Sequence, residues 1–147
     1  GRHYSVAGVH PGPVPPHRIA IWLGVYRPRA LALTGRVADG WIPSLSYARP
    51  DAVPELQDRI DEAAAEAGRD PAEIRRLYNV TGELPAEELT RFVLELGFDT
   101  LVFWPEDARQ LERFAGEVIP AVREAVASAR GRAPVAPAGG AEPEPGR

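Results

Sequence analysis

The sequence contains no cysteine, no methionine and no lysine. Without cysteine the chain can form neither a disulfide framework nor a thiolate metal site. Arginine supplies all 17 basic residues. We attribute this preference to coding bias and assign it no functional meaning. The absence of methionine agrees with the opening segment, residues 1–17, which is rich in proline and glycine and has no apolar period. We interpret this opening as an internal loop.

The sequence has no large excess of positive charge and no long apolar run. The net charge is −4 and the sequence pI is about 5.4, which argues against a nucleic-acid binder because neutralising phosphates requires a basic face. No apolar run reaches the length of about 18 residues that a membrane-spanning helix needs, and no signal peptide is recognisable. We therefore expect one domain at most, located in the cytoplasm, with no nucleic-acid or membrane partner.

Histidine is rare as well. His3, His10 and His17 all lie in the opening loop, and no carboxylate or second histidine stands at ligand spacing. The sequence therefore predicts no metal site. A Gly-x-Ser-x-Gly elbow is also absent, so nothing indicates a serine nucleophile.

A regular alternation of strand and helix patterns begins at residue 19. Residues 18–24 form a continuous apolar run that predicts a strand covered on both faces. Pro28 then stands at the first position of a predicted helix, where its missing N–H costs nothing. A short strand over 39–43 and a helix over 51–67 follow. The helix carries an apolar stripe at helical spacing and ends before Gly68.

The second half of the chain repeats the alternation. Asp70 and Pro71 predict a capped turn before a strand over 75–80. A helix over 85–97 and a strand over 98–104 come next, and Asp107 is expected to cap a long helix with a kink at Pro120. From residue 130 the chain has almost no bulky apolar residue, which predicts a disordered tail over 130–147. We therefore divide the chain into an irregular segment (1–18), a folded part (19–129) and this tail.

The alternation contains four strand–helix units and no hairpin signal. This order predicts an α/β fold with one parallel sheet and right-handed helical crossovers. Two architectures fit it: a small open doubly wound sheet, or half of an eight-stranded barrel. The period alone does not choose between them.

Three segments carry a family resemblance: "IAIWLGVYRPRALALTGRVADGWIPSL", "DEAAAEAGRDPAEIRRLYNV" and "LELGFDTLVFWPED". Together they resemble the C-terminal part of the luciferase-like monooxygenase family, whose members are flavin- or deazaflavin-dependent oxidoreductases built on a TIM barrel. The resemblance extends over residues 1–127, and the opening loop is similar to the segment before the fifth strand. It implies that the units are strands five to eight, the C-terminal half of a (β/α)8 barrel, and that the first four units are absent from this sequence.

The turn between the first strand and the first helix is the main candidate site. Its backbone N–H groups approach a helix start, where unpaired donors and the helix dipole favour an anion. Glycine allows close approach, and the arginines add charge. An ordinary strand-to-helix connection is the competing interpretation. The resemblance implies that the family holds the phosphate of its cofactor here, either FMN or the deazaflavin coenzyme. The predicted cofactor-binding residues are Gly24, Val25, Tyr26, Arg27, Pro28 and Arg29.

The other candidates follow the later strands, because barrels of this kind place their active sites at the C-terminal ends of the strands. The residues expected to line the active site are Ser44, Ser46, Asn79, Thr81, Trp104 and Glu106. Barrel packing is the competing interpretation for Trp104, and turn formation for Asn79 and Thr81. We assign no catalytic residue, because the family's proton-transfer and ring-stacking residues lie partly in the absent half.

Two functional hypotheses follow. In the first, the chain is part of an oxidoreductase in which a reduced flavin or deazaflavin delivers hydride, or activates oxygen, against a small organic substrate. In the second, the chain is a non-catalytic half-barrel remnant, or a module that pairs with the missing N-terminal half or with a second copy. The second hypothesis rests on the two exposed strand edges of an open half, which proteins usually cover.

Overall fold

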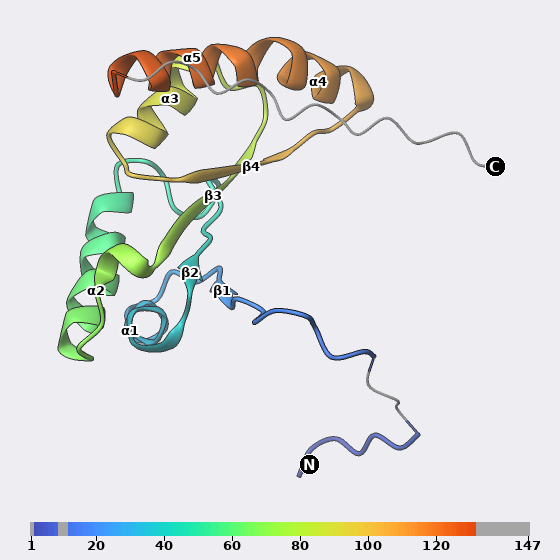
Figure 1. Ribbon diagram of the computed structural model, residues 1–147, viewed down its shortest axis with the longest axis vertical. Helices are drawn as coiled ribbons and strands as arrows, with labels where there is room; N and C mark the ends of the chain where they lie inside the picture. The colour runs from blue at the N-terminus through green and yellow to red at the C-terminus, as the bar shows by residue number, and fades with distance from the viewer. Residues whose placement is uncertain (1, 9–11, 132–147) are drawn as a thin grey trace.

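The computed structural model describes residues 2–8 and 12–131 and shows the predicted alternation of strands and helices (Figure 1). Its elements in chain order are β1 (Trp22–Leu23), α1 (Pro28–Val37), β2 (Gly40–Trp41), α2 (Val53–Glu66), η1 (Pro71–Glu73), β3 (Arg75–Thr81), α3 (Ala86–Leu94), β4 (Thr100–Trp104), α4 (Ala108–Arg113), η2 (Phe114–Val118) and α5 (Ile119–Ala129). The described residues before β1 contain no helix or strand and trail away from the sheet. Most of the predicted tail lies outside the described residues.

The four strands form one sheet in the order β1-β2-β3-β4, and every neighbouring pair is parallel. In Figure 1 the helices lie on the left and upper side of the curved sheet, and the opposite side carries no helix. A doubly wound fold would have helices on both faces. The parallel sheet covered on one side therefore confirms the expected half barrel.

The two faces of β3 have different environments. Arg76, Tyr78 and Val80 point toward the helices, where Tyr78 and Val80 belong to the buried apolar core. Leu77 and Asn79 alternate with them and point to the side without helices, which we call the inner face. Leu77 is nevertheless buried, so neighbouring side chains cover the inner face at this position. This alternation assigns every residue of the sheet to one face.

Tyr78 is at the centre of the core. Its ring stacks on Phe98 at 4.3 Å between ring centroids and meets Phe92 edge-on at 5.3 Å. Its hydroxyl donates a hydrogen bond to the carbonyl of Ala48. Burial raises the pKa of Tyr78 to about 12, which favours the neutral phenol that donates this hydrogen bond.

β1 is shorter and more exposed than the sequence predicts. Only Trp22 and Leu23 pair with β2, and the side chains of Ile19 and Ile21 are 65% and 59% exposed. The prediction of a strand covered on both faces is wrong, because β1 is an edge strand and no described element covers its inner face. Asp39 holds this edge: its carboxylate accepts hydrogen bonds from the Ile21 N–H and from Arg18, and these lower its pKa.

The last helical region contains a π-helical turn, η2, in place of a simple kink at Pro120. Proline has no N–H and cannot complete the α-helical pattern, and the N–H of Ile119 bonds instead to the carbonyl of Phe114. The wider turn keeps Phe114, Val118 and Val122 packed against the core. It therefore joins α4 and α5 without turning their apolar faces away from the sheet.

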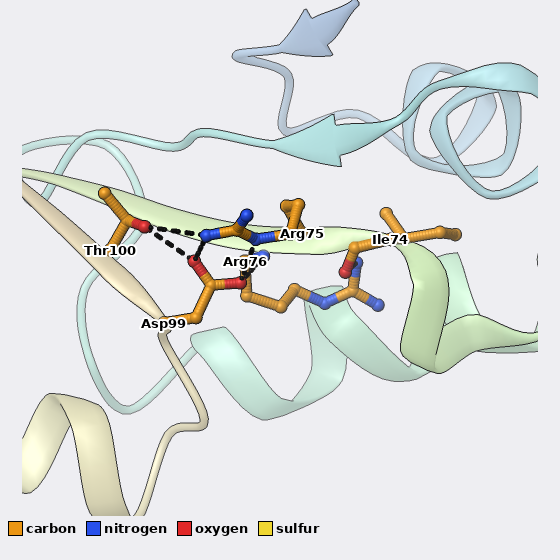
Figure 2. Close-up of polar contacts among 5 residues, drawn as sticks. All are labelled: Ile74, Arg75, Arg76, Asp99 and Thr100. Carbon is orange, nitrogen blue, oxygen red and sulfur yellow. Dashed lines mark hydrogen bonds and ion pairs between the residues drawn. The ribbon is translucent and has the colours of Figure 1, made fainter. Parts of the chain in front are cut away.

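The N-terminal ends of β3 and β4 are joined by a cluster of charged groups (Figure 2). Arg75 donates two hydrogen bonds to the Asp99 carboxylate, at 2.8 and 2.9 Å, and the backbone N–H of Arg76 donates a third at 3.1 Å. Thr100 donates to the same carboxylate at 2.7 Å. The guanidinium of Arg76 turns to the other face and pairs with Asp61 of α2. In barrels this end contributes stability, and the opposite end carries the chemistry.

Candidate functional site

The loop between β1 and α1 lies at the C-terminal edge of the sheet. Arg27 is the N-cap residue of α1, and its carbonyl accepts hydrogen bonds from the N–H groups of Ala30 and Leu31, both at 2.9 Å. No side chain caps this helix end, and the first turn contains no acidic residue. The positive end of the helix dipole is therefore not neutralised by a carboxylate of its own turn.

Contacts from β2 fix the backbone of this loop. The indole N–H of Trp41 donates to the carbonyl of Val25 at 2.8 Å, and Val25 and Tyr26 pack against the core. At Gly24 the chain passes close to β2, since a Cβ there would lie 3.1 Å from the carbonyl oxygen of Ile42. A side chain at this position would require the loop or the neighbouring backbone to shift by a few tenths of an ångström.

The charge of the loop is also available to a ligand. Arg27 and Arg29 are exposed, and neither forms an ion pair with any other residue in 2–8 or 12–131. Guanidinium groups beside a helix N-terminus make a donor set that fits a phosphate group. The predicted loop, Gly24 to Arg29, thus combines a helix start without a side-chain cap with two exposed arginines, and its role as a phosphate site stays a prediction.

Three of the predicted lining residues meet at the same edge. The indole N–H of Trp104 donates to the side-chain oxygen of Asn79 at 3.3 Å, and the amide nitrogen of Asn79 donates to the Ser44 hydroxyl at 3.4 Å. The backbone N–H of Ser44 donates to the Tyr26 hydroxyl at 3.0 Å. We call Tyr26, Ser44, Asn79 and Trp104 the rim chain. It links the ends of all four strands.

The other predicted lining residues lie outside the rim chain. Thr81 is exposed and stands opposite Trp104 in the strand register. Ser46 is exposed and forms no hydrogen bond with the rim chain. Glu106 is exposed, and its backbone N–H bonds to the side chain of Gln110. A role for these three residues as active-site lining stays a prediction.

Sequence reasoning included Tyr26 in the loop for its backbone N–H, but it did not predict the contacts of the Tyr26 side chain and did not single out Tyr47. The Tyr26 hydroxyl reaches the start of the loop after β2, and the Tyr47 ring lies 5.5 Å from the Tyr26 ring while remaining 77% exposed. No spacing pattern connects these two positions, because they lie in loops after different strands. Only the parallel pairing of β1 and β2 brings them together.

The two histidines that the structure describes form no recognisable site. His3 and His17 are exposed, and His10 lies outside the described residues. Residues 2–8 and 12–131 contain no group of three or more histidine or carboxylate side chains that could hold a metal ion. None of the helices in this part of the chain is long and apolar enough to cross a membrane.

Comparison with curated proteins finds relatives that share part of the chain. The phthiodiolone/phenolphthiodiolone dimycocerosates ketoreductase of Mycobacterium bovis is 41% identical over 64 residues, which are 42% of this chain and 16% of that protein. The protein of that name from Mycobacterium kansasii is 39% identical over 64 residues, or 17% of its length. That from Mycobacterium sp. (strain JLS) is 35% identical over 75 residues, or 20% of its length. This chain therefore matches only a small part of each relative.

A family model gives the wider match. The model described as luciferase-like monooxygenase matches residues 1–82, which include the β1–α1 loop, β2 and the whole of β3. The half-barrel topology agrees with the barrel that the sequence resemblance implies. Since the match covers 82 of 147 residues and the curated relatives are oxidoreductases by name, the chain belongs to the luciferase-like monooxygenase family.

Proposed function

We propose that this chain is the C-terminal half of a flavin- or deazaflavin-dependent oxidoreductase, in which the β1–α1 loop holds the phosphate of the cofactor. The observation that carries the proposal is the loop itself. It has a helix start without an acidic residue, two arginines that pair with no carboxylate of the described residues, and a backbone fixed by Trp41. The family match includes this loop and supports the proposal.

The residues of the chain bind and orient the cofactor in this proposal. Arg27 and Arg29 supply positive charge, and the backbone N–H groups of the loop donate hydrogen bonds to the phosphate oxygens. When bound, FMN or the deazaflavin coenzyme supplies two-electron chemistry, either hydride transfer or oxygen activation. The name of the curated relatives, ketoreductase, favours hydride transfer to the carbonyl group of an organic substrate.

The test compares FMN with riboflavin, which carries the same ring system but no phosphate. Both are titrated into the isotope-labelled chain, and the backbone amide resonances are followed by NMR. We expect FMN to shift the resonances of Gly24, Val25, Tyr26, Arg27 and Arg29, and riboflavin to leave them unchanged. Equal shifts with both ligands, or FMN shifts confined to other residues, would contradict a phosphate site in this loop.

A charge-removing variant sharpens this test. Replacing both arginines, Arg27→Gln with Arg29→Gln, should weaken FMN binding by about tenfold or more, because each charge-assisted hydrogen bond contributes about 1.5–3 kcal/mol. Arg49→Gln is the matched control, since Arg49 is an exposed arginine in another loop, 3.7 Å from Asp51. The control should bind FMN as the unchanged chain does.

A second candidate function is supported by a different observation. Trp22 and Trp104 are 46% and 60% exposed at opposite ends of the strand order, and both belong to the inner face. Large exposed aromatic side chains on a sheet face indicate a surface that another polypeptide segment or chain covers. The alternative is therefore a half-barrel module without activity of its own, which pairs with an N-terminal half or with a second copy.

A further inference from the structure

Trp104 occupies an unusual position for so large a side chain. It ends β4 at the C-terminal edge of the sheet and is 60% exposed. Its neighbour Phe103 points to the opposite face and stacks on Phe114 at 3.8 Å, which fixes the direction of the strand end. The Trp104 indole must therefore lie on the inner face, where no described element covers it.

Asn79 determines where the indole lies. Its side-chain oxygen accepts the hydrogen bond from the Trp104 N–H, and its amide nitrogen donates to Ser44. The backbone of Asn79 is fixed by two further bonds of 2.9 Å, from its N–H to the Pro43 carbonyl and from the Leu45 N–H to its own carbonyl. The amide is thus held from both sides, so its oxygen is directed at the indole.

We infer that Trp104 provides a stacking surface for a planar heteroaromatic ring, and that Asn79 is the positioning residue that orients this surface. The protein already satisfies the only polar atom of the indole, so the side chain offers a ligand its π-surface, which favours offset stacking with another aromatic ring. The rim chain connects Trp104 through Asn79 and Ser44 to the β1–α1 loop. The assignment of the ring to the flavin or deazaflavin rests on the proposed function.

The chain contains three tryptophans. The test labels them with fluorotryptophan and follows their resonances by fluorine NMR. The variant Trp104→Phe assigns the Trp104 resonance. Riboflavin is the probe, because it has the ring without the phosphate. We expect riboflavin to shift the Trp104 resonance and to leave that of the buried Trp41 unchanged. An unshifted Trp104 resonance, or a shift at Trp22 alone, would overturn the inference.

Two variants of Asn79 separate positioning from a structural role. Asn79→Leu removes the acceptor and should reduce the riboflavin-induced shift of Trp104 at least several-fold. Asn79→Asp keeps an oxygen acceptor for the indole N–H and should restore most of the shift. If Asn79→Leu responds to riboflavin as the unchanged chain does, or if Asn79→Asp fails to rescue it while remaining folded by circular dichroism, Asn79 does not position the ring.

The two proposals fail in different ways. The phosphate loop is tested by the difference between FMN and riboflavin at the loop amides, whereas the stacking surface is tested by riboflavin alone at Trp104. A Trp104 shift without loop shifts would leave the stacking surface standing and reject the phosphate site. FMN-induced shifts of the loop amides together with an unshifted Trp104 resonance would support the phosphate site and reject the stacking surface.

Discussion

Asp99 shows how one side chain can join two strands and make the stability of the fold depend on pH. Partial burial by itself would raise the pKa of Asp99, but hydrogen bonds from Arg75, Thr100 and the backbone N–H of Arg76 outweigh this effect and lower it. The lowered pKa means that folding favours the ionised carboxylate. The resulting stabilisation is present above the ordinary value of 3.8 and is lost as the pH falls through the lower pKa of the folded state.

Replacing Asp99 with asparagine should therefore remove part of the acid sensitivity. We expect Asp99→Asn to lower the free energy of unfolding at neutral pH by about 1 kcal/mol, a value reduced for the partial exposure of the pair. Below about pH 4 the difference should shrink, because the native carboxylate becomes protonated. Urea unfolding across this pH range measures both effects. Asp58→Asn, on the exposed side of α2, should show neither.

At the scale of elements, the contact between α1 and α2 depends on one glycine. Gly35 lies inside α1, where glycine costs about 1 kcal/mol relative to alanine. The structure explains its presence, because a Cβ there would lie 2.3 Å from the carbonyl oxygen of Ile60 and 2.8 Å from the backbone nitrogen of Ala64. Arg69 strengthens the same contact by donating to the carbonyls of Gly35 and Ala38 at 2.6 and 2.9 Å.

We expect Gly35→Ala to destabilise the protein despite the better helix propensity of alanine. The added methyl group must push α1 away from the α2 backbone, at a cost of about 1–3 kcal/mol or more. Gly116→Ala is the matched control, since no described atom beyond the neighbouring turns of its own helix lies within 4 Å of the added Cβ. Thermal unfolding should show a lower midpoint for the first variant and an unchanged or higher midpoint for the second. Equal midpoints would show that the two helices separate without cost.

Among the residues that the structure describes, no helix lies on the inner face of the sheet. Helices pack on the outer side of the sheet only, while β1 and β4 remain free edges at its two ends. Exposed apolar side chains occur at both edges: Ile21 just before β1, Trp22 in β1 and Trp104 in β4. Free strand edges and exposed apolar faces favour association with another chain.

Expressed alone, the chain should therefore self-associate and bind a flavin only weakly. Pairing β4 of one copy with β1 of another would cover both edges. A ring held on the inner face would meet walls from one half of the barrel only, so a phosphate loop and one stacking surface should not reach micromolar affinity. Light scattering combined with an FMN fluorescence titration measures both properties. A monomer with micromolar or tighter affinity would refute this view of the isolated half.

Much of the fold followed from local sequence patterns. The apolar runs and helical stripes correctly predicted the parallel order of four strands, and the caps at Asp70 and Asp107 occur as predicted, with side chains that accept from Ala72 and Gln110. These features depend on neighbouring residues in the chain, so periodicity and capping chemistry are enough to predict them. The β1–α1 loop was recognisable for the same reason, because glycine, arginine and proline stand together there.

Contacts between distant segments were decided only by the tertiary structure. The apolar run before Gly24 suggested a covered strand, but its exposure depends on which elements lie beside β1, and that information is not local. The bonds from Trp104 to Asn79 and from Ser44 to Tyr26 join residues that follow different strands. Their meeting requires the parallel register, which places the C-terminal ends of all strands at one edge. The sequence alone thus determined the elements and the candidate loop, and the pairing of strands determined which side chains share the rim.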